Sequence, residues 1–297
     1  MENITSLFGS GGDLYIKMID ELCLEDIKVN YYFLGENEFE EQIRTDPKIA
    51  NQTYWTEMLY RTHWASVIAI IRSRRWIWGV SSALKDQNAY AFAACLRGFL
   101  EACADTSTAF LGGPNIPNTL SDNCQRINES ILGKCENISV SKELEEILIH
   151  FSFARKNTKK AEIPNSHHAK KITEYIEVIR KANVPKIDEL YYYLCEFTHP
   201  SNSSIGLWSK QDSKNECEIQ IVSNREGEAI SWFHSEFKDS FMELLTYSFH
   251  APLLTLRVLN SFSLSSLHTP DLNRWDFSGL KIWKGIEEGL KRLAKET

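Results

Sequence analysis

The sequence predicts an all-α protein, a helical bundle built on a long helical hairpin, with one small β-hairpin inserted near residues 205–222. Three observations favour this fold class. Apolar residues recur at helical spacing through most of the chain. Only 14 Gly and 8 Pro occur among 297 residues, too few for the frequent turns of a sandwich or barrel. With 43% hydrophobic and 25% charged residues, the chain has enough apolar mass to form a core.

Two long helices dominate the first half of the predicted fold. A shorter helix over 13–23 precedes them. The first long helix is expected to open near Asn51 and to cover 54–85, and the second covers 88–111, where apolar residues follow Phe92 at i+3, i+4, i+7 and i+8. Because few residues separate the two long helices, they are expected to pack as an antiparallel hairpin.

The second half is predicted to contain shorter helices, the inserted hairpin and two further helices. The expected helical ranges are 118–133, 141–156, 168–183 and 187–198, then a long helix from about 228 and a final amphipathic helix from 278. Ser141 is placed to cap its helix, and Pro252 is expected to kink or end the long one. Residues 205–210 and 217–222 are expected to form the strands, since the second alternates apolar and polar side chains.

This pattern divides the chain into three expected parts. Residues 1–50 form an N-terminal extension of helix and loop, 51–262 form the helical bundle with its hairpin, and 263–297 add a C-terminal amphipathic helix that packs on the bundle. The start of the chain carries no secretory signal, and no uncharged apolar stretch is long enough to span a bilayer, so a cytoplasmic protein is expected.

Composition excludes several classes of function. The net charge of −7 argues against a chain that coats duplex nucleic acid over its whole surface. The seven Cys include no Cys-x-x-Cys pair, which argues against a disulfide framework or a zinc ribbon. No phosphate loop, dinucleotide fingerprint, nucleophile elbow or His-Glu-x-x-His motif is present, so neither a metal nor a cofactor is expected.

A polar stripe on the second long helix is the first candidate for chemistry. Arg97, Glu101 and Asp105 lie at i, i+4 and i+8, and apolar residues border the stripe. As a structural feature it is a half-buried row of ion pairs that fixes the register of neighbouring helices. As a functional feature it lets Arg97 present a guanidinium to a phosphate while Glu101 holds the Arg97 side chain.

The second candidate lies at the end of the helix over 187–198. Tyr192, Glu196 and His199 fall at i, i+4 and i+7, which predicts a shared tyrosine, carboxylate and imidazole face. Pro200 disfavours helical geometry at His199, so the imidazole is expected at a helix C-terminus, where the macrodipole favours its protonated form as a general acid or phosphate ligand. The alternative is that His199 only caps the last carbonyls.

These residues carry a family resemblance. A long helical hairpin with an Arg-x-x-x-Glu pair on its second helix, then a helix that ends in Tyr-x-x-Leu-x-Glu-Phe-x-His-Pro-Ser, then a short β-hairpin, resembles bacterial proteins of the HEPN-like helical class. The matching residues are Arg97, Glu101, Tyr191, Leu194, Glu196, Phe197, His199, Pro200 and Ser201. The similarity covers about residues 54–262.

The resemblance implies a helical bundle, commonly a homodimer, that acts in toxin, abortive-infection or antiviral systems. Many members of the class are metal-independent ribonucleases, and others are non-catalytic binding or assembly modules. Catalytic members carry an Arg followed four to six residues later by His, and this chain has no such pair. The nearest Arg before His199 is Arg180, so a nuclease site here requires Arg97 and His199 to meet in space.

Two function hypotheses follow from these residues. In the first, the protein binds nucleic acid and cleaves RNA: His199 moves a proton, Arg97 stabilises the phosphorane charge, Glu101 and Glu196 orient them, and Tyr192 is a secondary polar partner. In the second, the protein is a non-catalytic interaction or scaffold subunit of a defence complex, and these side chains specify bundle packing.

A basic segment provides the candidate nucleic-acid contacts. Between residues 155 and 186 there are nine Lys or Arg against three Glu, in a chain that is acidic overall. Lys159, Lys160, Lys170 and Lys171 are the residues expected to contact phosphates. The alternative interpretation is a solvated surface in which these cations pair with nearby carboxylates.

Overall fold

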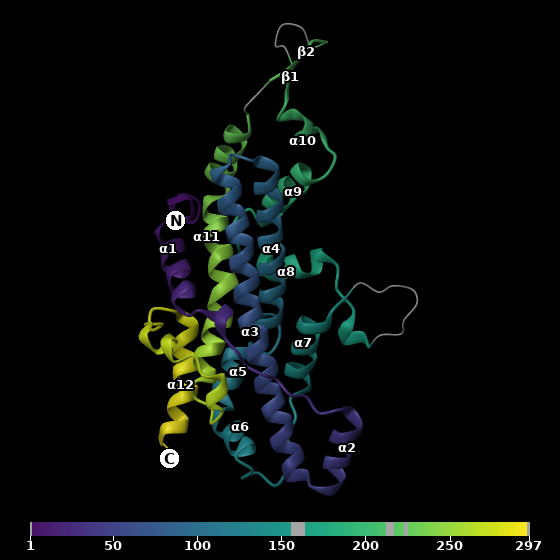
Figure 1. Cartoon of the computed structure of the whole chain (residues 1–297), viewed down its shortest axis with the longest axis vertical. Helices are drawn as coiled ribbons and strands as arrows, with labels where there is room; N and C mark the ends of the chain where they lie inside the picture. Colours follow the sequence, from purple (N-terminus) through teal and green to yellow (C-terminus); the bar gives the residue numbers. More distant parts are fainter. Residues whose placement is uncertain (1, 156–163, 212–216, 223–224, 296–297) are drawn as a thin grey trace. The chain divides into compact units, whose positions relative to one another are not determined.

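The computed structural model describes residues 2–155, 164–211, 217–222 and 225–295, and it confirms the predicted fold class (Figure 1). Helices account for nearly all of the regular structure in these ranges, and the sheet found in them is a two-stranded antiparallel hairpin. Among the described helices, none is long and apolar enough to cross a membrane.

The chain divides into two compact units, each assembled from three separate segments. Unit 1 consists of residues 1–18, 71–105 and 172–248, and unit 2 consists of residues 19–70, 106–171 and 249–297. The long helices α3 (Pro47–Lys85) and α11 (Glu226–Leu259) contribute to both units. Neither unit is therefore a continuous stretch of the sequence.

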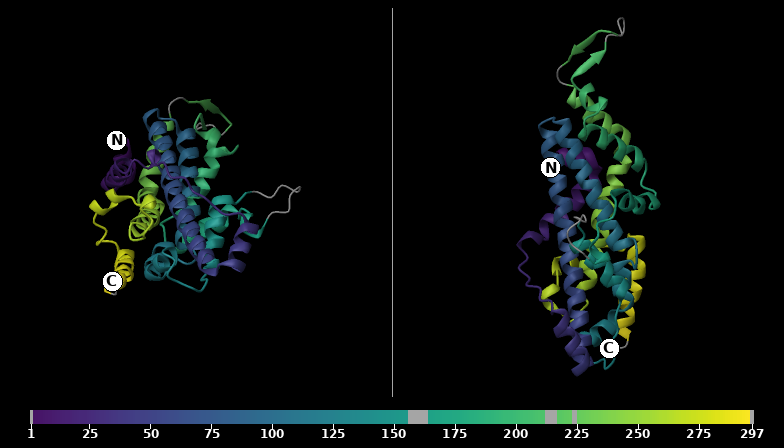
Figure 2. Two further views of the ribbon diagram at one scale, coloured as in Figure 1. Left: turned by 60° about the horizontal axis from the view of Figure 1, so that its bottom comes forward. Right: turned by 90° about the vertical axis from the view of Figure 1, so that its right-hand side faces the viewer.

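Unit 1 contains the helices that carry the candidate site. Besides parts of α3 and α11 it holds most of α1 (Glu2–Glu21) and α4 (Ala89–Leu111), then α8 (Ile172–Lys181), α9 (Ile187–Thr198), α10 (Asn202–Gly206), β1 (Ser209–Gln211) and β2 (Ile219–Ile221). The unit 1 segments of α3, α4 and α11 lie side by side in the views of Figures 1 and 2. Phe8 of α1 packs edge-on against Phe99 of α4 and Phe241 of α11, so aromatic rings join three helices in the core.

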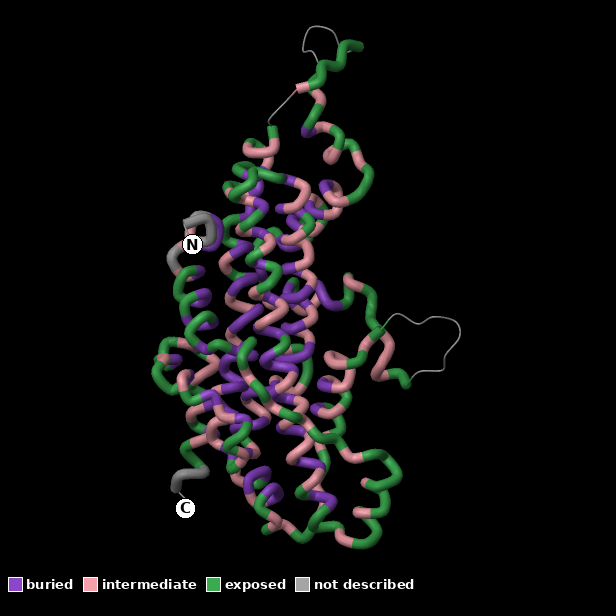
Figure 3. Tube along the Cα trace, in the orientation of Figure 1, coloured by how far each residue is buried: buried purple, intermediate pink, exposed green. Residues whose placement is uncertain are grey.

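Unit 2 combines the start of α3 and the end of α11 with shorter helices. These are η1 (Leu24–Asp26), α2 (Glu36–Thr45), α5 (Ile116–Asp122), α6 (Cys124–Ile131), α7 (Lys142–Phe153), η2 (Asn165–His167), η3 (Ser265–Leu267), η4 (Pro270–Arg274) and α12 (Lys281–Lys295). The C-terminal helix α12 packs on α5 and α6. Figure 3 shows that buried positions follow the long helices, whereas α2 and both strands have none.

The helical hairpin formed by α3 and α4 is antiparallel, as the sequence predicts. Gly79 lies against Cys95, and Gly98 lies against the indole ring of Trp76, so the paired positions advance in opposite directions along the two helices. The side chain of Asn88 accepts a hydrogen bond from the Ala91 N–H and caps the start of α4. The glycines allow close approach, because a Cβ at either position would meet the facing side chain at 2.7 Å.

Several expected boundaries are wrong, and each has a local cause. Helix α3 begins at Pro47, not after Asn51, because Asp46 caps it: the carboxylate accepts from the N–H groups of residues 48 and 49. The expected helix over 118–133 is divided at Asn123 into α5 and α6.

Three details of the second half also differ from the expectation. Ser141 occupies the N-cap position of α7, but its side chain makes no capping hydrogen bond. Pro252 lies inside α11 and does not end it, and the non-helical backbone of α11 is at Phe237. Residues 205 and 206 belong to α10, so both strands of the hairpin are shorter than expected.

Candidate functional site

Arg97 lies at the centre of a polar cluster between α4 and the end of α9, within unit 1. Its Nε donates to Oε1 of Glu101 at 2.9 Å, one helical turn further along α4. Its Nη1 donates to the hydroxyl of Thr198 at 3.1 Å and lies 2.9 Å from Nε2 of His199. The two residues that a nuclease site requires are therefore in direct contact, although 102 positions separate them in the chain.

His199 reaches Arg97 because the chain leaves the helix at this residue. It is the C-cap of α9, with extended backbone angles (φ −112°, ψ 160°), and its N–H donates to the carbonyl of Cys195. Pro200 follows and disfavours a helical conformation at His199. The direction of the imidazole is set by this extended conformation and not by the helical period.

The predicted shared face of Tyr192, Glu196 and His199 is consequently not formed. Tyr192 is 58% exposed and contacts the ring of its neighbour Tyr193. The carboxylate of Glu196 accepts from the hydroxyl of Ser203 at 3.5 Å, and neither Tyr192 nor Glu196 has a contact with Arg97 or His199 in the described part of the chain. Of the five residues expected in the site, the structure brings together Arg97, Glu101 and His199.

The contact with Arg97 also fixes the tautomer of His199. A guanidinium carries only donors, so Nε2 of His199 must accept this hydrogen bond. The imidazole in this arrangement is therefore neutral and carries its proton on Nδ1. A protonated imidazole could not accept this hydrogen bond, so the cation expected at the helix terminus would require Arg97 to turn away.

Tyr191 and Thr198 complete the cluster, and the sequence interpretation missed both. The Tyr191 hydroxyl donates to Oε1 of Glu101 at 3.4 Å, and the Tyr191 ring lies 5.7 Å from Cζ of Arg97. The spacing of these residues could have predicted their shared position. Tyr191, Cys195 and Thr198 fall at i, i+4 and i+7, which places them on one face of α9. This polar stripe, and not the one through Tyr192, faces α4.

The electrostatics of the cluster keep its groups in defined states. Burial by itself lowers the pKa of Arg97, but the hydrogen bond to Glu101 and the neighbouring Cys195 outweigh it, so the pKa of Arg97 is raised. Burial, followed by the hydrogen bond with Cys195, raises the pKa of Tyr191 to about 12. Arg97 therefore stays cationic and Tyr191 stays a neutral donor at physiological pH.

The cluster retains hydrogen-bond donors for a ligand. Nη2 of Arg97 has no partner among the described residues, and the imidazole of His199 is exposed to solvent. The side chain of Arg97 is 24% exposed. Asp105, the third member of the expected stripe, instead pairs with Arg72 of α3 at 2.7 Å. The anion-binding capacity of the stripe is therefore confined to Arg97.

The basic segment is partly neutralised where the structure describes it. Arg180 pairs with Asp188 and Glu177, and the hydrogen bond from Arg180 holds the pKa of Asp188 below its usual value. Lys181 pairs with Glu177, and Lys186 pairs with Glu236 of α11.

The four lysines expected to contact phosphates are only half described. Lys170 and Lys171 are exposed just before α8. Lys159 and Lys160 lie outside the described residues. Lys170 and Lys171 are therefore the two predicted contacts whose exposure the structure supports.

The described residues contain no group of three His, Cys, Asp or Glu side chains arranged to hold a metal ion. The described residues include all seven cysteines, and none of them forms a disulfide. Comparison of the chain with protein-family models, with curated proteins and with solved structures returns no match.

Proposed function

We propose that the protein binds RNA and cleaves it without a metal ion at the cluster of Arg97, Glu101, Tyr191 and His199. The observation that carries this proposal is the 2.9 Å contact between Nη1 of Arg97 and Nε2 of His199, next to the unpartnered Nη2 of Arg97. Phosphodiester transfer requires a group that takes a proton and a cation that stabilises the developing charge. The neutral imidazole of His199 and the guanidinium of Arg97 would supply these two roles.

The proposed reaction begins when a phosphate binds to Arg97. The guanidinium then turns from His199 toward the phosphate oxygens, which frees Nε2. Nε2 takes the proton of the ribose 2′-hydroxyl, and the 2′-oxygen attacks phosphorus while Arg97 stabilises the charge of the phosphorane. The bond to the 5′-oxygen breaks, that oxygen takes a proton from the His199 imidazolium, and the products are a 2′,3′-cyclic phosphate and a 5′-hydroxyl.

Glu101 and Tyr191 are positioning residues in this proposal. Glu101 holds Nε of Arg97 at 2.9 Å, and the Tyr191 hydroxyl donates to the same carboxylate oxygen. Together they hold the Arg97 guanidinium beside His199. Exposed Lys170 and Lys171, with Lys159 and Lys160, would contribute phosphate contacts outside the cluster.

The biological setting follows from the resemblance to HEPN proteins. It supports a role in bacterial defence or in a toxin–antitoxin pair, and it predicts a homodimer, which sedimentation of the purified protein measures.

The test is cleavage of a single-stranded RNA in the presence of EDTA. Wild-type protein is expected to cut it and to leave 2′,3′-cyclic phosphate ends, and His199→Ala is expected to lose at least about a hundredfold in rate. His234→Ala is the matched control, since His234 lies on α11 outside the cluster. The same oligonucleotide in DNA form lacks the nucleophile and is expected to remain intact. Equal RNA cleavage by wild type and His199→Ala would overturn the proposal.

A second candidate function is a non-catalytic interaction subunit, in which the cluster clamps the end of α9 to α4. It is favoured by the hydrogen bonds that Arg97 already makes to Glu101 and Thr198. In that case Arg97→Ala and His199→Ala lower the melting temperature by several degrees, because each leaves a partner unsatisfied. No RNA cleavage is then expected from any variant.

A further inference from the structure

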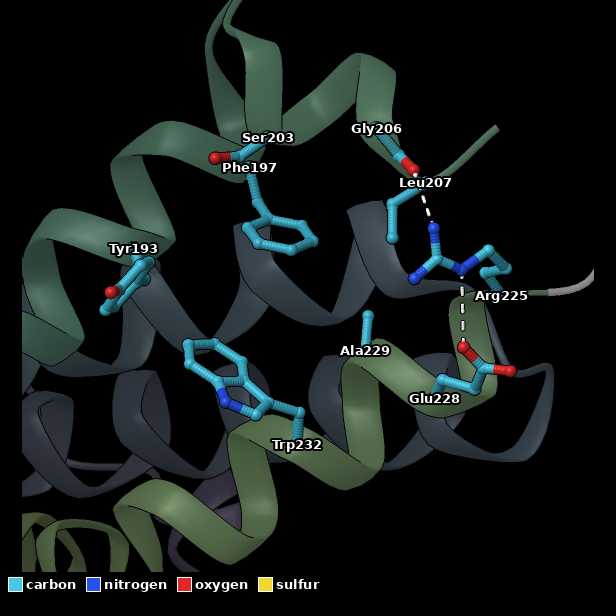
Figure 4. A pocket seen from close by; sticks show the side chains of 9 residues that line it. All are labelled: Tyr193, Phe197, Ser203, Gly206, Leu207, Arg225, Glu228, Ala229 and Trp232. Atoms are coloured by element: carbon cyan, nitrogen blue, oxygen red, sulfur yellow. Dashed lines mark hydrogen bonds and ion pairs between the residues drawn. The ribbon is translucent and has the colours of Figure 1, made fainter. Parts of the chain in front are cut away.

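A second site lies on the other side of α9, in a cavity of about 450 Å³ within unit 1 (Figure 4). Helices α9, α10 and α11 supply its walls. The cavity is lined by Tyr193, Phe197, Ser203, Gly206, Leu207, Arg225, Glu228, Ala229 and Trp232. Its volume falls within the range of about 300–1,000 Å³ that is typical of small-molecule sites. None of these residues belongs to the Arg97 cluster, so the cavity is independent of the proposed cleavage site.

Aromatic rings form one end of this cavity. Tyr193 and Trp232 meet edge to face, with ring centroids 4.9 Å apart and an interplanar angle of 83°. Trp232 also contacts Phe233 and Phe237 of the core, which fixes its ring in place. With 37% of Trp232 exposed, indole surface remains available to a ligand. The Phe197 ring lines the cavity beside Trp232 (Figure 4), and Phe233 of the core contacts both rings.

A guanidinium stands at the opposite end. Nε of Arg225 donates to Glu228 at 3.3 Å, and Nη1 donates to the carbonyl of Gly206 at 3.4 Å. Nη2 has no partner in the part of the chain that the structure describes, and Figure 4 shows it pointing toward Ala229 and the interior of the cavity. The ion pair with Glu228 is a long, exposed contact, so an anionic ligand would displace it at little cost.

We propose that this cavity binds a nucleotide, with the base stacked on Trp232 beside Tyr193 and the phosphate held by Arg225. A flat π-system matches the aromatic wall, because bases of every kind stack on aromatic side chains. An anionic group matches the free Nη2, because phosphate accepts charge-assisted hydrogen bonds from arginine. The same chemistry is offered by a free nucleotide and by one nucleotide unit of an RNA strand.

Isothermal titration calorimetry tests the proposal with the four ribonucleoside 5′-monophosphates, their nucleosides and ribose 5-phosphate. At least one nucleotide is expected to bind with a stoichiometry of one. Its nucleoside and ribose 5-phosphate are expected to bind at least about tenfold more weakly, because each lacks half of the recognised chemistry. Absence of binding by all four nucleotides to the wild-type protein would overturn the proposal.

Two variants separate the halves of the site. Arg225→Met is expected to weaken nucleotide binding about tenfold and to leave nucleoside binding unchanged, since the cation contacts only the phosphate. Trp232→Leu is expected to weaken the binding of the nucleotide and of the nucleoside about tenfold, since both carry the base. The matched controls are Arg274→Met, which removes another exposed i, i+3 ion pair, and Trp78→Leu, a tryptophan of similar exposure.

Folding is checked by the melting temperature of each variant. If Trp232→Leu unfolds, Arg225→Met still decides the question, because Arg225 is exposed and precedes α11. Unchanged nucleotide affinity in Arg225→Met would contradict the proposed phosphate contact. Competition by a ten-nucleotide single-stranded RNA identifies the source of the ligand: displacement of the nucleotide indicates an RNA unit, and retention of the nucleotide indicates a free nucleotide.

Discussion

At the scale of single residues, Arg97 combines a structural and a chemical capacity in one side chain. Its hydrogen bonds to Glu101, Thr198 and His199 join α4 to the end of α9. The same bonds hold a permanent cation against a neutral imidazole, and they leave Nη2 of Arg97 for an anion. Under the proposed function this side chain contributes to stability and to chemistry, so variants of Arg97 must be measured for both.

His63 predicts how the stability of the protein depends on pH. It is buried in unit 2 at 1% exposure, its Nδ1 lies 2.7 Å from the Tyr31 hydroxyl, and burial lowers the pKa of His63 to about 4. The unfolded chain binds a proton at this histidine near pH 6.5, whereas the folded chain stays neutral there. Stability from this residue is therefore complete above pH 6.5 and is lost as the pH falls toward 4.

The measurement is the free energy of unfolding in urea at pH 7 and pH 5. Between these values His63 is expected to account for a loss of about 2 kcal/mol. His63→Asn removes the titrating group and should reduce the pH dependence by that amount. Equal pH dependence in wild type and His63→Asn would show that His63 is not the buried neutral residue described here.

At the scale of elements, two glycines on α12 provide a matched pair. Gly289 is buried where α12 packs on α5, and a Cβ there would lie 2.9 Å from the backbone carbonyl of Ser121. Gly285, one turn earlier on the same helix, has no atom within 4 Å of the Cβ position. The backbone of α5 cannot yield as a flexible side chain would, so the two positions respond to alanine in opposite ways.

Gly285→Ala is expected to raise stability by up to about 1 kcal/mol, because alanine has the higher helix propensity. Gly289→Ala is expected to lower it by about 1–3 kcal/mol, because α12 must move away from α5. Thermal unfolding of both variants followed by circular dichroism checks this. A rise in melting temperature for Gly289→Ala would contradict the packing of α12 on α5.

The elements also show what the sequence can and cannot predict. Helix α9 occupies 187–198, the range that the apolar spacing and Pro200 predict, because local signals determine both of its ends. The start of α3 was missed because the capping pair Asp46-Pro47 precedes the apolar repeat that locates the helix body. Pro252 is accommodated in the buried interior of α11, where surrounding packing outweighs the cost of one lost hydrogen bond.

The candidate site was predictable only in part. The pairing of Arg97 with Glu101 follows from their i, i+4 spacing on one helix. The meeting of Arg97 with His199 depends on tertiary packing between residues far apart in the chain, which periodicity does not encode. Tyr191, and not the expected Tyr192, contacts Glu101. Because His199 leaves the helix, positions counted back from it along α9 point to Tyr192 instead.

At the scale of the whole molecule, the net charge of −7 confines any nucleic-acid contact to local groups of cations. Arg180, Lys181 and Lys186 already have carboxylate partners. Replacing Lys159, Lys160, Lys170 and Lys171 together by Gln is expected to weaken RNA binding about equally for all sequences. The affinity for RNA is expected to fall only slowly with salt concentration in the wild type, and still more slowly in this variant.

Fluorescence anisotropy with a labelled single-stranded RNA at low and moderate salt measures both quantities. The control is a second quadruple variant with the same change in charge, made at exposed lysines on other elements: Lys85, Lys142, Lys281 and Lys284 to Gln. If the two quadruple variants lose the same affinity, the basic segment has no particular role, and only the net charge matters.

Joint action of Arg97 and His199 on an RNA phosphodiester is tested by a double-mutant cycle of cleavage rates. The rates are those of wild type, Arg97→Ala, His199→Ala and the double variant, with melting temperatures measured alongside. Each single variant is expected to lose at least about a hundredfold, and the double variant little more, because residues that act as a unit are not additive. His199 is exposed, so His199→Ala should melt within about 2 °C of wild type. Losses that multiply in the double variant, or cleavage by it at the wild-type rate, would contradict joint action of the two residues.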